Sequence, residues 1–184
     1  MAKSGDTLTN PDGEYLRFLQ TSTETDGELL EMEVTYVPHS ETPPEHCHPN
    51  QEETFRVLSG TFVAALDGVE HTYEVGDTFV VPPGTMHWMN NVSDEEGKLS
   101  WQVRPALDTE SFFETMWGFA NATQNDDGEP PGLLQIALTL HEFRKEFRPA
   151  KPSYVMQRIV YGILAPIARM RGYRARYEPS GSAE

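Results

Sequence analysis

The sequence has little cysteine and no long apolar segment. Cys47 is the one cysteine among 184 residues, which excludes an internal disulfide and gives no sign of an oxidising compartment. The longest apolar run, Ile159 to Ala168, is about half of the ~20 residues that a membrane helix needs. The first residues carry no apolar stretch typical of a secretory signal. These absences favour a soluble, cytoplasmic protein.

Lysine is also scarce. Four lysines and ten arginines stand against 29 acidic residues, and the formal net charge is -15. Such a surface argues against nucleic acid as a partner, because phosphates require basic side chains. An acid-rich, lysine-poor surface suits a salty cytoplasm, where charge keeps proteins hydrated and apart. The composition therefore predicts a halophile, with an ordinary acidic bacterial protein as the alternative.

The basic residues that do occur are concentrated near the C-terminus. From His141 to Glu178 the chain carries nine basic and three acidic residues, a balance of +6, while the remainder carries -21. A basic segment next to an acidic body suggests that the segment docks on that body or on a partner chain. Because it already has an acidic surface to meet, this segment is not expected to bind a membrane.

Short apolar runs separated by turn residues extend from Gly13 to about Arg104. Asp67-Gly68 lies between two such runs and predicts a two-residue hairpin turn, in which both central residues need positive φ. Many short, evenly spaced strands are typical of a β-sandwich or β-barrel. The sequence therefore predicts a mostly β domain at residues 1–107, including its N-terminal strands.

The remainder of the chain has helical periodicity. Leu133 to Phe143 is apolar on one face, and a helix is expected from Ser153 to about Met170, interrupted or kinked near Pro166. A further helical pattern spans residues 112–120. We expect a C-terminal helical extension at residues 108–178 and a disordered tail at 179–184.

Four side chains have the spacing of metal ligands. His46 and His48 share one face of an extended segment, because side chains alternate along a strand. Glu53 opens the next run, and His87 follows a Pro-Pro-Gly turn further on. Neutral imidazole and carboxylate suit divalent transition metals. Taken singly, the first two histidines also fit a solvated loop, and His87 also fits a core histidine.

Considered jointly, these positions resemble the cupin superfamily, in its small single-barrel branch. The resemblance covers about Leu29 to Arg104 and lacks only the usual glycine before the first histidine, where Thr42 and Pro43 stand. Two motifs carry it at the family's spacing: His46, His48, Glu53 and Gly60 in the first, and Gly76, Pro82, Gly84, His87 and Asn91 in the second.

The resemblance implies a single double-stranded β-helix, the cupin jelly-roll barrel. It implies that His46, His48, Glu53 and His87 bind one divalent transition metal in the mouth of that barrel. Fe or Mn is favoured for oxygen chemistry, although Ni, Zn, Co and Cu accept the same ligands. Cupins commonly form dimers, so a homodimer is expected.

Strand alternation suggests which residues line a pocket beside the metal. Phe55 and Val57 share the face of Glu53, and Met89 shares that of His87. Phe62 and Trp101 complete an apolar lining suited to a small, partly apolar molecule. The alternative is that all five belong to an ordinary barrel core.

Three functions then compete. The first is a metal-dependent, dioxygenase-like oxidoreductase acting on a small molecule. The second is a metal-dependent isomerase or lyase, for which Tyr73 or His71 would be the acid or base. The third is a non-enzymatic cupin that binds a small molecule. We favour the first, and the fold family alone cannot choose among them because it hosts many chemistries.

Overall fold

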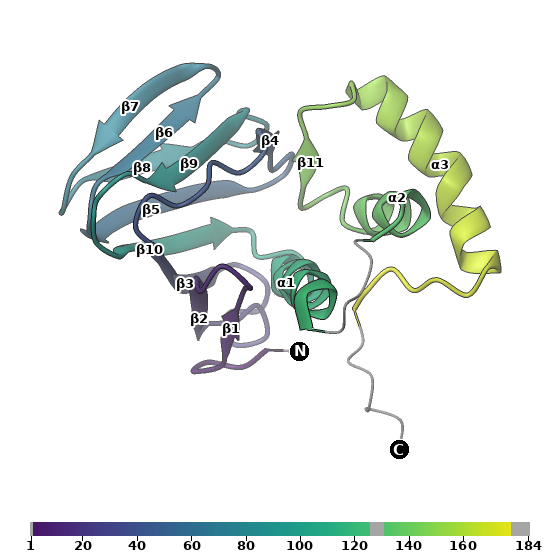
Figure 1. Cartoon of the computed structure of the whole chain (residues 1–184), viewed down its shortest axis with the longest axis horizontal. Coiled ribbons are helices and arrows are strands. Elements are labelled where there is room, and N and C mark those ends of the chain that lie inside the picture. The colour runs from purple at the N-terminus through teal and green to yellow at the C-terminus, as the bar shows by residue number, and fades with distance from the viewer. Residues whose placement is uncertain (1, 126–130, 178–184) are drawn as a thin grey trace.

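The computed structural model describes residues 2–125 and 131–177. It shows the predicted mostly β fold, with two antiparallel sheets followed by C-terminal helices (Figure 1). The expected disordered tail, 179–184, lies outside the described residues. The two sheets occupy one side of the molecule, α2 and α3 occupy the other, and β11 lies between them.

Both sheets are built from short strands whose neighbours are antiparallel. The first sheet has the order β1 (Thr7–Thr9), β2 (Tyr15–Gln20), β3 (Leu30–Tyr36), β10 (Gly97–Arg104), β5 (Glu52–Ser59) and β8 (Thr78–Val81). The second has the order β11 (Arg148–Pro149), β4 (His46–Cys47), β9 (His87–Asn91), β6 (Phe62–Leu66) and β7 (Val69–Tyr73).

The alternation of side chains in β5 fixes what faces the interior. Glu53, Phe55 and Val57 are buried, whereas Glu52 and Arg56 on the other face are exposed. This is the two-residue period of a strand with one face on a core and one in water. It puts a carboxylate among apolar side chains, where burial without partners would be costly.

The predicted hairpin is confirmed. β6 and β7 pair with Leu66 opposite Val69, which leaves Asp67 and Gly68 as the two-residue turn. Their φ angles are 48° and 79°, so both central residues adopt the positive φ that a type I′ turn requires.

One continuous hydrophobic core lies between the sheets. It contains Phe18, Phe55 and Phe62, all fully buried, and α1 (Thr109–Asn125) covers one end of it. Phe113 of α1 packs edge-on against Trp101 of β10, with ring centroids 5.2 Å apart. The first helix of the extension is thus anchored to the sheet core.

The other two helices, α2 (Leu133–Glu142) and α3 (Tyr154–Met170), pack on each other around a small core of Leu138, Ala165 and Ala168. The expected interruption near Pro166 was wrong, since α3 runs through it, and the alternative of a kink there stays a prediction. Pro166 is exposed, so its ring points to solvent, and it costs the helix a hydrogen bond without ending it.

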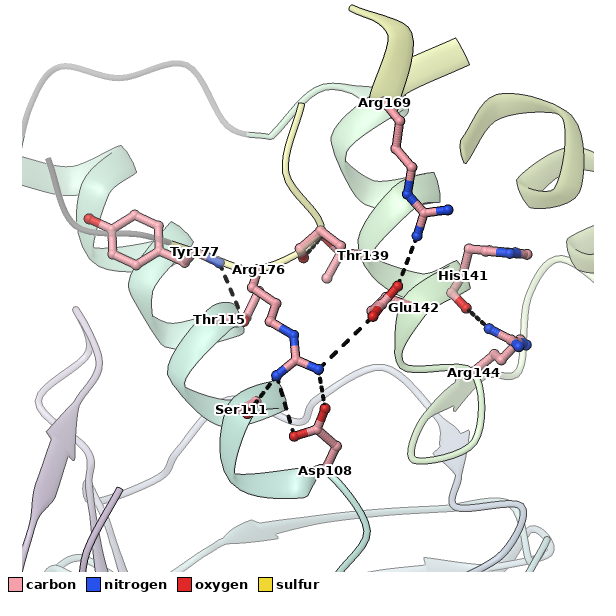
Figure 2. A network of polar contacts seen from close by, with 11 residues as sticks. Asp108, Ser111, Thr115, Thr139, His141, Glu142, Arg144, Arg169, Arg176 and Tyr177 are labelled. Carbon is pink, nitrogen blue, oxygen red and sulfur yellow. Dashed lines mark hydrogen bonds and ion pairs between the residues drawn. The ribbon is translucent and has the colours of Figure 1, made fainter. Parts of the chain in front are cut away.

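The basic C-terminal segment docks on the body. Arg176 forms an ion pair with Asp108, donates a hydrogen bond to the Ser111 hydroxyl at 3.0 Å, and lies 4.0 Å from Glu142 of α2 (Figure 2). Arg169 of α3 pairs with Glu142 at 2.9 Å. These contacts join α1, α2 and the end of the chain. Among the described helices, none is both long enough and apolar enough to cross a membrane.

Candidate metal centre

The strand pairing brings the distant histidines together. In the second sheet β4 and β9 pair with His46 directly opposite His87, although 41 positions separate them in the sequence. His48 follows two residues after His46, and Glu53 projects inward from β5 of the facing sheet. The four side chains therefore meet in the space between the two sheets.

The distances within this cluster suit a single ion. One ring nitrogen from each of His46, His48 and His87 lies within 4.8 Å of the others. The Glu53 carboxylate lies beside two of them, with Oε1 3.3 Å from His48 Nε2 and Oε2 3.1 Å from His87 Nε2. Three imidazoles and one carboxylate are a donor set that divalent transition metals accept.

The second nitrogen of every ring is held by a backbone carbonyl. The Nδ1 atoms of His46, His48 and His87 lie 2.9, 2.6 and 3.1 Å from carbonyl oxygens. A carbonyl oxygen can only accept, so each Nδ1 carries the proton. In the neutral ring the lone pair is then on Nε2, which is the atom available to a metal.

Two buried atoms at the centre lack hydrogen bonds. His48 Nε2 and Glu53 Oε2 are inaccessible to solvent and have no hydrogen-bond partner among the described residues. Buried polar atoms are normally satisfied, and a carboxylate facing a lone-pair nitrogen is unfavourable without a cation between them. The residues present therefore fit a bound divalent cation.

Burial and mutual contact shift the pKa values of all four groups. Burial, reinforced by His87 and His48, lowers the pKa of His46 to about 3, and burial also lowers the pKa of His48. Burial alone would lower the pKa of His87 and raise that of Glu53. Their proximity outweighs this: the pKa of His87 is raised by Glu53, and the pKa of Glu53 is lowered by the imidazoles.

Two positions that the cupin motifs do not include complete the centre, and both come from the C-terminal extension. The carbonyl that holds His48 Nδ1 belongs to Glu146, and the Phe147 ring stacks on His46 with centroids 4.8 Å apart. β11 then pairs with β4, placing Pro149 opposite His46. The basic charge of this segment predicted docking on the body, but no sequence signal marked these contacts.

Trp101 adds a further contact. Its indole Nε1–H donates to Glu53 Oε1 at 3.2 Å, so the carboxylate is oriented by the neighbouring strand β10. Sequence reasoning placed Trp101 beside the site as a pocket residue and missed this hydrogen bond. A buried tryptophan packs its apolar ring into a core while its indole N–H needs a hydrogen-bond acceptor, which the Glu53 carboxylate provides here.

The remaining predicted residues fall into two groups. Phe55, Val57, Phe62, Met89 and Trp101 are all buried in the core between the sheets. The pocket lining therefore stays a prediction.

His71 and Tyr73 lie on β7, separated from β9 by β6, and His71 is exposed. Neither is placed by the described fold next to the histidine cluster.

Asn91, the last residue of the second motif, has a structural role. It is fully buried, and its amide donates to the carbonyls of Val37 and Glu95 at 3.0 and 2.8 Å. Cys47, between the two histidines, is buried and belongs to none of the metal-holding groups found among the described residues.

Comparison with known proteins agrees with this geometry. Residues 32–103 match the family model described as a cupin domain. The chain is 30% identical over 103 residues to a curated oxidoreductase of Arthrobotrys oligospora, covering 51% of this chain and 40% of that protein. It is 31% identical over 108 residues to oxidoreductase iacF of Pestalotiopsis fici, covering 54% and 52%. The chain thus spans about half or less of these relatives.

A solved structure, a predicted oxalate decarboxylase from Thermotoga maritima, superposes with a TM-score of 0.49 and 17% identity. The superposition covers 57% of this chain and 98% of that one.

Proposed function

Residues 32–103 form a cupin domain, and we propose that this domain binds one divalent transition metal through His46, His48, His87 and Glu53. The observation that carries the proposal is the buried His48 Nε2, which has no hydrogen-bond partner among the described residues at a point where one nitrogen of each of the three rings lies within 4.8 Å of the others. Fe or Mn is the metal we favour because of the oxygen chemistry proposed below, although Ni, Zn, Co and Cu accept the same ligands.

We further propose that the protein is a dioxygenase-like oxidoreductase that acts on a small, partly apolar molecule. A bound ion of this kind would supply Lewis-acid and one-electron redox chemistry. Two curated relatives named oxidoreductases support the reaction class. The surrounding apolar side chains, among them Phe55 and Met89, would exclude water from the centre.

The chain's own residues would have three tasks at this centre. The carbonyls behind the imidazoles keep each Nδ1 protonated and each Nε2 free. Trp101 fixes the orientation of the Glu53 carboxylate. Phe147 covers one flank of the cluster by stacking on His46.

Anaerobic purification with elemental analysis, followed by oxygen-uptake assays on catechols, flavonols, diketones and thiols, tests the proposal. Bound iron or manganese with substrate-dependent oxygen uptake is the expected result. Tight metal binding without turnover of any of these compounds would contradict the enzyme and favour a non-enzymatic binding cupin. Absence of any tightly bound metal would overturn the metal site itself.

We also propose a homodimer. The outward side of α3 exposes Val155, Ile159 and Ile163, whose exposed fractions are 67%, 56% and 58%. Apolar side chains so exposed at intervals of four residues form one stripe of a helix and favour association. Light scattering of the whole chain and of an I159E/I163E variant should give the mass of a dimer and of a monomer. A monomeric wild-type chain would contradict this.

A further inference from the structure

A cavity of about 590 Å³ lies against the C-terminal extension, between α2, α3 and β11. We call it the basic cavity, because four of its lining residues are Arg144, Lys145, Arg148 and Arg158, and none is acidic. In a chain with 14 basic and 29 acidic residues, this composition is opposite to that of the whole.

Among the described residues the four cations have no carboxylate within ion-pair distance, although the Lys145 charge partly offsets the rise that burial causes in the pKa of Glu146. Within residues 2–125 and 131–177, none of them forms an ion pair with a carboxylate. Arg144 instead donates to the carbonyl of His141 at 2.6 Å, a contact visible in Figure 2. The Arg148 guanidinium lies over the Tyr154 ring, 3.9 Å from its centroid. Like charges gathered in this way repel, and a bound anion would relieve the repulsion.

A nearby histidine is consistent with the positive potential. His141 also lines the basic cavity, and burial lowers its pKa, with Arg144 and Arg169 lowering it further. Burial is the largest cause of this direction, and the guanidinium groups of Arg144 and Arg169 add to it because their field disfavours a proton on His141. The same field would favour a negative charge.

The rest of the lining is suited to a ring or an apolar chain. Leu140, Phe147, Tyr154 and Tyr161 supply apolar and aromatic surface to the cavity. Its volume falls within the roughly 300–1,000 Å³ typical of small-molecule sites, which combine apolar walls with a few charged groups. Guanidinium groups are well matched to carboxylate and phosphate, since they donate in a planar fork.

The cavity adjoins the candidate metal centre through one side chain. Phe147 lines the basic cavity, and the same ring stacks on His46 of the centre. We propose that the basic cavity binds a small aromatic or apolar molecule bearing one anionic group, and that this is the substrate class of the protein. The proposal that the cavity binds an anion rests on the cavity's own residues. The proposal that the cavity is the substrate site rests on the proposed function as well.

Isothermal titration calorimetry at fixed ionic strength with three probes tests the binding. The probes are naphthalene-2-carboxylate, 2-naphthyl phosphate and the uncharged naphthalene-2-carboxamide. We expect at least one anion to bind about tenfold or more tightly than the amide. The tighter anion identifies carboxylate or phosphate as the preferred group. Equal affinities for all three, or no binding, would overturn the proposal.

Substitutions locate the site. R158Q removes an exposed cation of α3 whose guanidinium lies 5.8 Å from the centroid of the Tyr154 ring, and R148Q removes the cation that lies nearer to that ring, at 3.9 Å. Each should weaken anion binding about tenfold and leave amide binding unchanged. R56Q, on the exposed face of β5, makes the same change in net charge away from the cavity. Equal weakening by R56Q would show that net charge alone acts, and would overturn the assignment.

Titration of an H87A variant separates this inference from the proposed function. The anion should bind it within about twofold of the wild-type affinity, because His87 does not line the basic cavity. In the wild-type protein, anion binding without oxygen uptake on any compound tested would leave the cavity standing and contradict the oxidoreductase. Metal-dependent oxygen uptake by the wild-type protein, with no preference for anions in the calorimetry, would support the oxidoreductase and overturn the basic cavity as an anion site.

Discussion

The β-sandwich and the C-terminal helices are stabilised to very different extents. The sandwich has one core that runs between both sheets and includes Phe18, Phe55 and Trp101. The α2–α3 pair is built around Leu138, Ala165 and Ala168, two of which are alanines. Apolar burial is the main favourable term in folding, so the helix pair depends on its attachment to the sandwich. Yet this weaker region supplies the carbonyl of Glu146 to His48. The stable region provides the ligands, and the weaker one orients one of them.

The largest expected effect removes a ligand from the sandwich. An H87A variant should lose metal affinity by more than the roughly 10–100-fold that is lost when a residue hydrogen-bonded to a ligand is removed. Elemental analysis after dialysis against a chelator measures this. H71A is the matched control, since His71 is exposed on β7 and should leave metal content unchanged. Full metal occupancy in H87A would contradict the four-ligand centre.

A core substitution in each region tests whether they unfold separately. L138A, in the helix pair, should cost about 2–5 kcal/mol locally and speed amide hydrogen exchange in α2 and α3, leaving β3 and β10 protected. L99A, in the sandwich core, should speed exchange in every element. Uniform acceleration by L138A would show that the two regions form one cooperative unit.

Removing one hydrogen-bond donor in the sandwich should have a smaller effect. W101F keeps an aromatic ring but removes the indole N–H that Glu53 Oε1 accepts. We expect metal affinity to fall about tenfold, because the carboxylate loses its orienting partner. Competition with a chromophoric chelator measures the change. W117F on α1, away from the four ligands, should have no effect on metal affinity.

The smallest expected effect is the pH dependence of metal affinity. Glu53 raises the pKa of His87, so in the metal-free protein His87 holds its proton to a higher pH than an ordinary histidine does. His48, held by the extension, has a lowered pKa and is already neutral. A metal must displace the His87 proton, so its affinity should rise several-fold per unit from about pH 6 until His87 is neutral. In W101F the rise of metal affinity with pH should persist. A metal affinity that does not change with pH in the wild-type protein would contradict a protonated His87.

The sequence was informative where local chemistry decides the structure. Alternation in β5 separated Glu53 from Glu52, and the turn at Asp67-Gly68 had the backbone that its residues require. The motif spacing brought His46 and His87 into one proposed site, and the pairing of β4 with β9 places them side by side. The expected homodimer and halophilic origin stay predictions.

The sequence was uninformative where contacts depend on backbone atoms far along the chain. The Glu146 carbonyl could come from any residue, so no side-chain pattern marks its approach to His48. β11 is two residues long, too short to have a period. The interruption expected near Pro166 failed because an exposed proline can be accommodated in a helix. The basic cavity likewise forms only when Arg148 of β11 and Arg158 of α3 meet.

The hydrogen bond between His48 and the Glu146 carbonyl has a consequence for biosynthesis. The two residues are 98 positions apart, and ribosomes deliver the N-terminal part first. All four proposed ligands emerge while the extension is still being made, so a nascent chain can form the sandwich with the His48 ring not yet held in its orientation. Emergence of residues 146–149, which lets β11 reach β4, then becomes the step at which the ligand geometry is complete. Tight metal binding is accordingly expected only after residues 146–149 have been synthesised and have packed on the sandwich.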